Sequence, residues 1–393
     1  MIARAGHLSR SMSPSGHHDE FQHRSFWKFP RRWVKMLSFI ALICFFSVGL
    51  GISIKRDQSF EHGEKLQDLG NDQAISRFPP PRQTQQHTHD PTILRVGDEY
   101  YLYHVGEHIF IHTAPSLAGP WKHVGSVLDA KSVIPKGDRA VPGPRPVSKA
   151  GCRDSAIGVA TSNSPGPGNW IDHGAVIETG TGNGSDVYPY TASNAIDPST
   201  LVTPDGQAYL TYGSYWHGIF QIPLSKDLLS PASTTEPDER QLAWEPESLA
   251  APNRLANNIC GDPSGPHPIE GAFISYNDGW YYLWYSHGFC CNLKEDNLPP
   301  GGQEYSIRVG RSQNPRGPFT DKAGTDLVKG GGELVYGSNG ETYAPGGQAV
   351  IRDGDTDVLY YHYLNTTVGI AFQDAFLGFN PLKYVDGWPI AQA

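Results

Sequence analysis

One pattern of polar and apolar positions recurs along the chain from about residue 89 onward. In each copy a turn residue leads into aromatic and β-branched positions, as in a strand that leaves a hairpin. Repeats of this kind predict an all-β fold in which small sheets stand around an axis, as in a β-propeller. The copies are Gly97–Val105, Gly206–Ser214, Asp278–His287 and Asp355–Tyr363, with a shared leucine at 102, 210, 283 and 359.

The spacing of these leucines reveals an irregular unit. The last two intervals agree on a unit length, but the interval from Leu102 to Leu210 is too long for one unit and too short for two. The strand phrase expected there is replaced by Lys136–Asp154, whose prolines exclude a central strand. The next residues, Ser155–Gly174, repeat the outer part of a unit found at Ile111–Gly125. The sequence therefore predicts five blades, of which the second lacks part of its strands.

A long apolar run precedes the repeats. Residues 36–54 contain no charged side chain, and their number nearly reaches the ~20 that a helix needs to cross a bilayer. Basic residues just before the run keep the N-terminus on the cytoplasmic side. We therefore expect a type II signal anchor, with the domain beyond it lumenal or extracellular. The basic residues are Lys28, Arg31, Arg32 and Lys35.

This interpretation divides the chain into four parts. They are a disordered cytoplasmic tail over 1–35, a transmembrane helix over 36–54, a flexible stem over 55–85 and the propeller over 86–393. Two alternatives remain open for the apolar run. One is a signal peptide cleaved near Lys55–Arg56, which would release a secreted protein, and the other is a buried core helix. Sequons at Asn183 and Asn365 fall on the exported side and are predicted glycosylation sites.

Composition agrees with this fold class and narrows the partners. Charged residues make up 18% of the chain, and 44 glycines and 32 prolines are typical of short strands joined by turns rather than of helical bundles. The net charge of −9 argues against a nucleic-acid partner and is compatible with a neutral polysaccharide. The five cysteines fit no zinc motif. One disulfide is plausible in an exported domain, and its pairing stays open.

Three acidic residues stand at the starts of predicted strands. Asp90 and Asp197 each precede a proline and a hydroxyl residue, and the proline favours an extended backbone that would aim the carboxylate. Glu270 lies just upstream of the next strand phrase among apolar neighbours, which raise the pKa of a carboxyl group. Because the innermost strands of a propeller surround its axis, we expect the three acids to converge. The alternative is that they are ordinary turn residues and a solvated loop acid.

Convergent carboxylates suit the hydrolysis of a glycosidic bond. One acid protonates the departing oxygen, and one base activates water. A third carboxylate can raise the pKa of the acid by repulsion and fix its orientation.

The chain resembles a known family over most of its length, from about His89 to Trp388. Its motifs are similar, in order, to those of the endo-1,5-α-L-arabinanases of glycoside hydrolase family 43: "HDPTILRVGDEYYLY", "SAIGVATS", "NAIDPSTLVTPDGQAYLTYGSYWHGI", "IEGAFISYNDGWYYLWYSHGFCC", "YSIRVGRSQNPRGPFTDKAG" and "YAPGGQAV". The resemblance implies a five-bladed β-propeller that cuts internal α-1,5 linkages of arabinan, a pectin side chain, with inversion of anomeric configuration.

The resemblance also implies roles for single residues. Asp90 matches the general base, Glu270 the general acid, and Asp197 the aspartate that tunes the pKa of the acid and orients it. Inversion is compatible with a base and an acid about 6.5–9.5 Å apart, which leaves room for water.

Contacts with the substrate are implied at three further positions. Trp216 would stack against an arabinose ring, and the alternative is an aromatic buried in its blade. Asn194 and Ser214 would form hydrogen bonds with sugar hydroxyls.

The sequence departs from the family pattern in two places. Gly347 stands where many bacterial members have a histidine that helps to hold a central ion, so no metal or other cofactor is predicted. The strands that normally precede "SAIGVATS" are absent, which agrees with the irregular spacing of the leucines.

Three other functions fit the same architecture. An exo-acting arabinofuranosidase or xylosidase would use the same acids, and loops would decide between a pocket and an open groove. A membrane-tethered propeller that binds carbohydrate without cleaving it would follow from the broken second blade. A protein-interaction platform is disfavoured because three acids match three hydrolytic roles. We expect a monomer.

Overall fold

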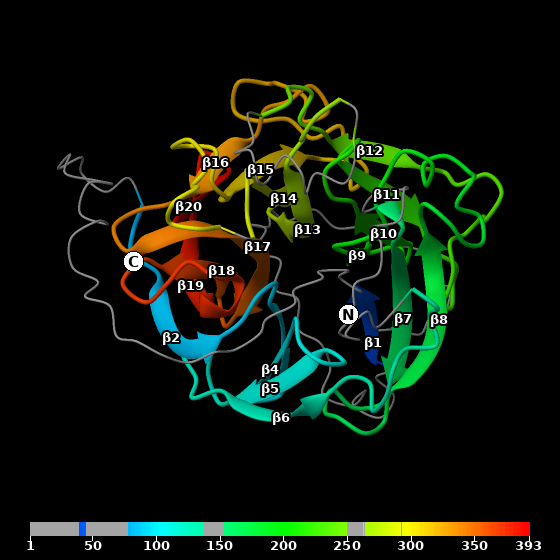
Figure 1. Ribbon diagram of the computed structural model, residues 1–393, viewed down its shortest axis with the longest axis horizontal. Helices are drawn as coiled ribbons and strands as arrows, with labels where there is room; N and C mark the ends of the chain where they lie inside the picture. The colour runs from blue at the N-terminus through cyan, green and yellow to red at the C-terminus, as the bar shows by residue number, and fades with distance from the viewer. Residues whose placement is uncertain (1–38, 45–77, 137–152, 250–261, 263, 292) are drawn as a thin grey trace, which may run out of the picture.

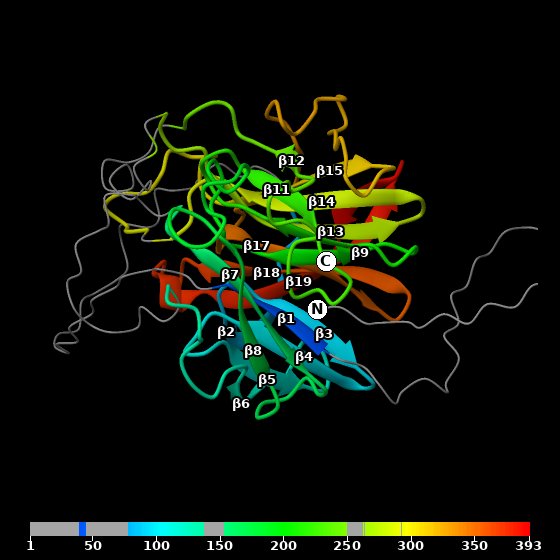
Figure 2. The same ribbon diagram turned by 90° about the vertical axis from the view of Figure 1, so that its right-hand side faces the viewer.

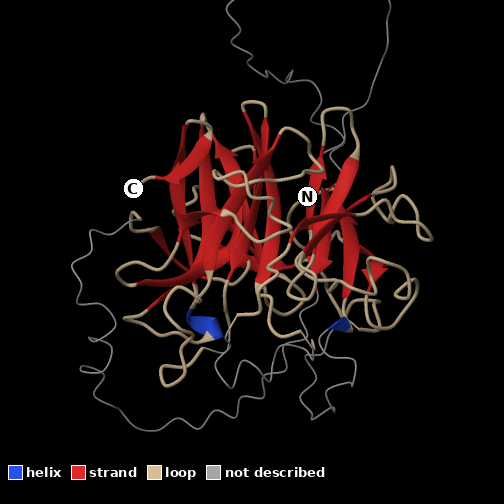
Figure 3. Cartoon of the chain, turned by 90° about the horizontal axis from the view of Figure 1, so that it is seen from above, coloured by secondary structure: helices blue, strands red, loops and turns tan. Residues whose placement is uncertain are grey.

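Five small sheets stand in a ring around a central axis (Figure 1). The computed structural model describes residues 39–44, 78–136, 153–249, 262, 264–291 and 293–393. Strands account for nearly all of the regular structure in these residues (Figure 3). The all-β propeller predicted from the repeats is confirmed.

Each blade is an antiparallel sheet whose strands follow one another outward from the axis, with exceptions in blades 2 and 5. Blade 1 contains β3 (Thr92–Val96), β4 (Glu99–His104), β5 (Phe110–Ala114) and β6 (Lys122–Ser126); blade 2 contains β1 (Phe39–Cys44), β7 (Ala156–Ser162) and β8 (Ile171–Glu178); blade 3 contains β9 (Ser199–Val202), β10 (Ala208–Tyr212), β11 (Ile219–Pro223) and β12 (Arg240–Ala243). Blade 4 contains β13 (Ile269–Asn277), β14 (Trp280–His287), β15 (Ser306–Ser312) and β16 (Glu333–Tyr336); blade 5 contains β17 (Thr342–Asp353), β18 (Thr356–Asn365), β19 (Phe376–Val385), β2 (Arg82–His87) and β20 (Trp388–Ala391), and the 3₁₀ helix η3 (Phe372–Asp374) precedes β19.

The repeated phrase forms the second strand of four blades. Its shared leucines lie in β4, β10, β14 and β18, and all four are fully buried. Apolar side chains from neighbouring blades meet in separate clusters, so every blade is packed against the next. Burial of this apolar surface is the main term that holds the ring together.

Blade 5 joins the two ends of the propeller. Its outer strand β2 comes from the start of the domain and pairs antiparallel with β19 from the end. The predicted stem extended to residue 85, but β2 begins at Arg82, so the propeller starts earlier than the predicted boundary at 86. The remainder of the predicted stem up to residue 77, and the predicted tail over 1–35, lie outside the described residues.

Blade 2 has the irregularity that the leucine spacing predicted. The segment β7–β8 forms its outer part, and β1 pairs antiparallel with β7 from Phe39–Ser162 to Cys44–Ile157. Figure 2 shows β1 in dark blue on this side of the ring. Because the prolines exclude a strand at this place, the backbone groups along one edge of β7 would lack partners. β1 supplies these partners.

The apolar run over 36–54 thus contributes a strand in the part that the structure describes. A helix long and apolar enough to cross a membrane is not found among the described residues. The other residues of the run lie outside the described part of the chain. The predicted helix over 36–54 is therefore wrong for Phe39–Cys44, which form a strand, whereas a membrane anchor in this part of the chain stays a prediction.

Candidate active site

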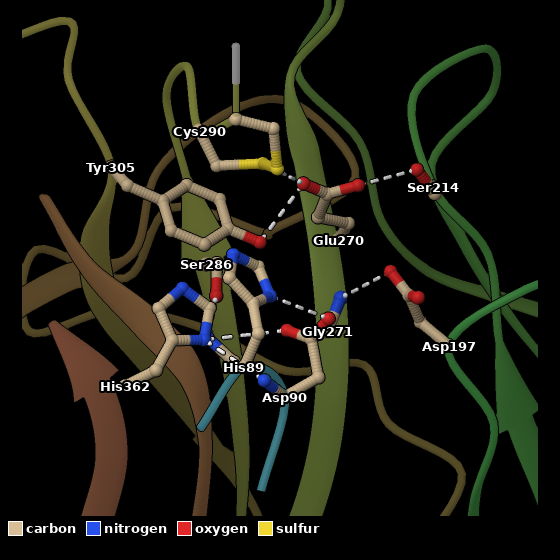
Figure 4. Close-up of a disulfide and its surroundings, with 12 residues drawn as sticks. His89, Asp90, Asp197, Ser214, Glu270, Gly271, Ser286, Cys290, Tyr305 and His362 are labelled. Atoms are coloured by element: carbon tan, nitrogen blue, oxygen red, sulfur yellow. Dashed lines mark hydrogen bonds and ion pairs between the residues drawn. A yellow bond between two sulfur atoms is a disulfide. The ribbon is translucent and has the colours of Figure 1, made fainter. Parts of the chain in front are cut away.

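The side chains of Asp90, Asp197 and Glu270 lie in one group (Figure 4). Asp90 precedes β3 and Asp197 precedes β9, so the two residues occupy matching places in blades 1 and 3. Glu270 is the second residue of β13. The amide of the next residue, Gly271, donates a hydrogen bond to Asp197 Oδ2 at 3.1 Å. The structure thus brings together the three acids selected from the sequence.

The backbone of Asp90 and Asp197 is not extended, so the geometry predicted from the following prolines is wrong. Their φ angles are +50° and +54°. A following proline disfavours the right-handed helical region, and aspartate tolerates the left-handed region better than most residues do. Left-handed backbone at a non-glycine residue costs about 1–3 kcal/mol and tends to occur at functional sites. Both aspartates adopt this backbone conformation, which indicates that both side chains must point in a particular direction.

Glu270 is buried and held by two hydroxyl groups. Ser214 Oγ donates to Oε2 at 2.6 Å, and the Tyr305 hydroxyl donates to Oε1 at 2.9 Å. A bulge between Glu270 and Phe273 interrupts the pairing of β13 with β14, and bulges of this kind re-aim side chains beside active sites. Burial raises the pKa of Glu270, the two hydroxyls oppose the shift, and the charge of Asp90 adds to it. The raised pKa predicted from the apolar neighbours is confirmed.

Asp90 lies beside two histidines. His89 Nδ1 is 2.9 Å from Asp90 Oδ2, and the Asp90 amide donates to His362 Nδ1 at 3.1 Å. The ring of His89 stacks between those of His362 and Phe372. Burial alone would raise the pKa of Asp90, but the charge of His89 and the contacts with both histidines outweigh it, so the pKa falls below its ordinary value. Asp90 therefore keeps its charge.

The third acid, Asp197, has a raised pKa, in contrast to the lowered pKa of Asp90. Burial raises its pKa, the charges of Glu270 and Asp90 raise it further, and the Gly271 amide only partly offsets them. The raised pKa values of Glu270 and Asp197 favour a proton on this buried pair, whereas the lowered pKa of Asp90 favours its carboxylate. Neighbouring carboxyl groups with opposed pKa shifts can divide the roles of acid and base between them.

The histidines around Asp90 also form a cluster of potential metal ligands. One donor atom from each of His89, Asp90 and His362 lies within 4.8 Å of the others. The Nδ1 atoms of both histidines are hydrogen-bonded to Asp90 itself, and the two rings stack with centroids 3.8 Å apart. These contacts explain why the three residues lie together, because the two histidines orient Asp90. Gly347 has no ligand to offer, as the sequence indicated.

Gly347 leaves room for Asp90 and His362. A Cβ atom at this position would lie 2.5 Å from Asp90 Oδ1 and 2.6 Å from His362 Nδ1. We therefore expect Gly347→Ala to displace both side chains and to lower kcat about tenfold or more, because small misplacement of a reacting group is costly. Steady-state rates on a polysaccharide substrate measure the effect.

Gly354→Ala is the matched control for this substitution. Gly354 has the same φ of +59°, lies in the turn between β17 and β18, and has open space around its Cα. Both alanine variants carry the backbone strain of about 1–2 kcal/mol, but only the Cβ of Gly347→Ala meets Asp90 and His362. Equal kcat values for the two folded variants would contradict the proposed contact.

The predicted sugar-binding residues have other contacts in the structure. Trp216 is 9% exposed, and the guanidinium carbon of Arg153 lies 4.6 Å from the centre of its ring, as expected for the alternative of a buried blade aromatic. The hydroxyl of Ser214 is bonded to Glu270. Asn194 is buried at 3% exposure. Stacking by Trp216 and hydrogen bonds from Asn194 and Ser214 to sugar remain predictions.

Sequence reasoning missed the residues that hold the acids in place. His89 stands directly before Asp90 in the "HDPTIL" stretch, and its position next to an aspartate was the available signal. Tyr305 lies in the residues before β15, and His362 in β18 belongs to the repeated phrase. Nothing in the local pattern around Tyr305 or His362 distinguishes them from the many aromatic residues of neighbouring strands.

Comparison with known proteins agrees with this fold. A family model described as Glycosyl hydrolases family 43 matches residues 84–389. The "Probable arabinan endo-1,5-alpha-L-arabinosidase B" of Aspergillus fumigatus is 53% identical over 80% of this chain and 89% of its own length. The "Arabinan endo-1,5-alpha-L-arabinosidase B" of Emericella nidulans is 50% identical over 81% of this chain and 86% of its own length.

A solved structure of Cellvibrio cellulosa alpha-L-arabinanase complexed with arabinohexaose is similar in fold. It is 26% identical, with a TM-score of 0.61, and the match covers 79% of this chain and 96% of that chain. Sequence and fold lead to the same assignment, and the chain belongs to glycosyl hydrolases family 43.

Proposed function

We propose that this protein hydrolyses internal α-1,5-L-arabinofuranosidic bonds of arabinan with inversion of configuration. Glu270 is the general acid, Asp90 is the general base, and Asp197 raises the pKa of the acid and fixes its position. The observation that carries the proposal is the opposed direction of two pKa shifts. The pKa of Glu270 is raised, and the pKa of Asp90 is lowered.

The mechanism follows from these protonation states. Asp90, ionised beside His89 and His362, accepts a proton from water, and the water oxygen attacks the anomeric carbon in one displacement. Glu270, protonated in its buried position, gives its proton to the departing glycosidic oxygen. The Gly271 amide binds Asp197 and belongs to the same strand as Glu270, so it links the modulating acid to the backbone that carries the donor. Each turnover leaves a proton on Asp90 and removes one from Glu270, and exchange with solvent restores both.

The choice of arabinan as substrate rests on the relatives. Two fungal proteins that share at least half of their aligned residues with this chain are named as arabinan endo-1,5-alpha-L-arabinosidases. The Cellvibrio structure was determined with arabinohexaose, an oligosaccharide of the same sugar. These names favour endo action over the exo-acting arabinofuranosidase or xylosidase that the same three acids would also serve.

A test of endo action uses linear debranched arabinan. It compares the rate at which viscosity falls with the rate at which reducing ends appear. An endo-acting enzyme lowers the viscosity of the polymer before many reducing ends appear, whereas an exo-acting enzyme releases reducing sugar with little early loss of viscosity. The anomeric form of the first product, followed by NMR, reports inversion. Early products of a single sugar with retained viscosity would contradict the proposal.

A catalytically inactive, carbohydrate-binding propeller is the second candidate, because of one specific observation. In blade 2, β1 pairs with β7 in the place of the missing strand phrase. The same assay with a chain in which the family's strands are restored before residue 155 separates the two candidates. Cleavage by the restored chain alone, with binding by both, would favour the inactive form.

We also propose that the chain enters the secretory pathway through residues 36–54, as a membrane anchor or as a signal peptide. The sequon Asn183 is exposed, and Asn365, the last residue of β18, is partly exposed, so both side chains are within reach of glycosylation. Carbonate extraction of membranes separates an anchored protein from a secreted one. Loss of mass on treatment with an endoglycosidase tests the two sequons, and a cytosolic, unglycosylated protein would contradict the proposal.

A further inference from the structure

Two adjacent cysteines form a disulfide beside the candidate acid. Cys290 and Cys291 follow β14 and are bonded to each other. Cys290 Sγ lies 3.4 Å from Glu270 Oε1, the same oxygen that accepts a hydrogen bond from Tyr305 (Figure 4). Both cysteines are partly exposed, and with His89 and His362 they line a small cavity.

The oxidation state of this pair decides what Oε1 can bind. A sulfur in a disulfide has no proton and cannot donate a hydrogen bond, so Cys290 occupies a place around Oε1 without satisfying that oxygen. A thiol at the same position carries an S–H group, which is a weak donor. Reduction would therefore give Glu270 a third donor in addition to Ser214 and Tyr305.

We propose that the Cys290–Cys291 disulfide is a redox-sensitive positioning element that keeps Glu270 effective as a proton donor. The inference rests on the proposed role of Glu270 as the general acid. A small-molecule dithiol is the reductant: its two S–H groups reduce the bond, the Cys290–Cys291 S–S bond breaks, each cysteine gains a proton, and the reductant becomes a cyclic disulfide. The product is a Cys290 thiol that donates to Oε1 and favours the carboxylate over the acid.

The other groups that face Glu270 are not changed by mild reduction. They are the carboxyl groups of Asp90 and Asp197, the imidazole of His89, the hydroxyl of Ser214 and the phenols of Tyr215 and Tyr305. Burial and these neighbours give a raised pKa for Glu270 in the oxidised protein. A new donor to the carboxylate lowers this pKa, so protonated Glu270 is lost at a lower pH.

The expected result is a shift of the alkaline limb of the pH profile. Treating the full chain with excess dithiothreitol should move the alkaline limb of kcat/KM down by about half a pH unit, which is about a threefold loss of rate beyond the limb. Mass spectrometry after alkylation identifies the reduced Cys290 and Cys291. Reoxidation should restore the profile.

Two variants control the experiment. Cys290→Ala/Cys291→Ala should not shift its limb on reduction, although Cys44, Cys152 and Cys260 are still present. Ser214→Ala removes a donor from Oε2, so it should move the limb to higher pH and show that this limb reports Glu270. A reduced pair with an unshifted limb, or an equal shift in the double variant, would overturn the proposal.

Failure of the proposed function is distinguishable from failure of this inference. The carboxyl carbon of Glu270, labelled with ¹³C and assigned with Glu270→Gln, gives its pKa by NMR whether or not arabinan is cleaved. A pKa that falls on reduction supports the positioning element even in a chain without hydrolytic activity. A pKa that is unchanged or higher in the reduced protein rejects it.

Discussion

Replacing Glu270 with glutamine is expected to lower kcat on arabinan by at least ~10²-fold. Glutamine preserves the size of the side chain, and its one amide oxygen can still accept from either Ser214 or Tyr305, but it has no acidic proton to give to the departing oxygen. Steady-state kinetics on debranched arabinan measure the loss. A nitrophenyl arabino-oligosaccharide should lose far less rate, because its leaving group needs little protonation.

The control for this substitution is Glu333→Gln in the same blade. The carboxylate of Glu333 pairs with Lys322 at 3.4 Å on the outer strand β16, away from the axis. Its kcat should stay near that of the unmodified chain. A loss below tenfold in Glu270→Gln, or the same loss on both substrates, would assign the proton donor to another residue.

The second large effect is expected for Asp90→Asn, with kcat lowered by about 10²–10⁴-fold. Asparagine keeps the shape of the side chain but cannot accept a proton from the attacking water. It also removes the charge that His89 and His362 stabilise, which is the reason that the pKa of Asp90 is low. Rates on debranched arabinan, with circular dichroism to verify the fold, measure the loss.

Rescue by azide distinguishes a lost base from a damaged site. Azide needs no deprotonation, and the Asp90→Asn substitution removes the negative charge that would repel it from the anomeric carbon. Azide should therefore restore part of the rate of this variant and give an inverted glycosyl azide. Asp98→Asn is the control, because its side chain is fully exposed at the turn between β3 and β4 of the same blade. If azide restored no rate and gave no glycosyl azide, the result would argue against Asp90 as the base.

The architecture could be predicted because it repeats. The strand phrase fixes the second strand of four blades, and its absence at one place identified blade 2 as incomplete. The shared Asp-Pro phrase placed Asp90 and Asp197 at equivalent strand starts, and a propeller brings equivalent strand starts to one axis. The apolar neighbours of Glu270 predicted burial and hence the direction of its pKa shift.

The details of the site could not be predicted because they depend on contacts between distant segments. His362 meets Asp90 across 272 positions of the chain, and Tyr305 reaches Glu270 from another part of blade 4. The left-handed backbone of the two aspartates overrides the local preference set by proline. The partner of β7 is also non-local, since β1 comes from a segment whose composition is that of a membrane helix.

β1 belongs to the predicted membrane leader and also pairs with β7 in blade 2. Membrane insertion or cleavage of the leader therefore affects whether blade 2 is complete. Phe39–Cys44 cannot lie in a bilayer and in blade 2 at the same time, so a leader held in the membrane or removed near Lys55 takes one strand away from the ring. The vacated edge of β7 would leave its N–H and C=O groups without strand partners, as on any exposed sheet edge. Processing of the N-terminus would then determine whether the edge of β7 is covered by β1 or left open.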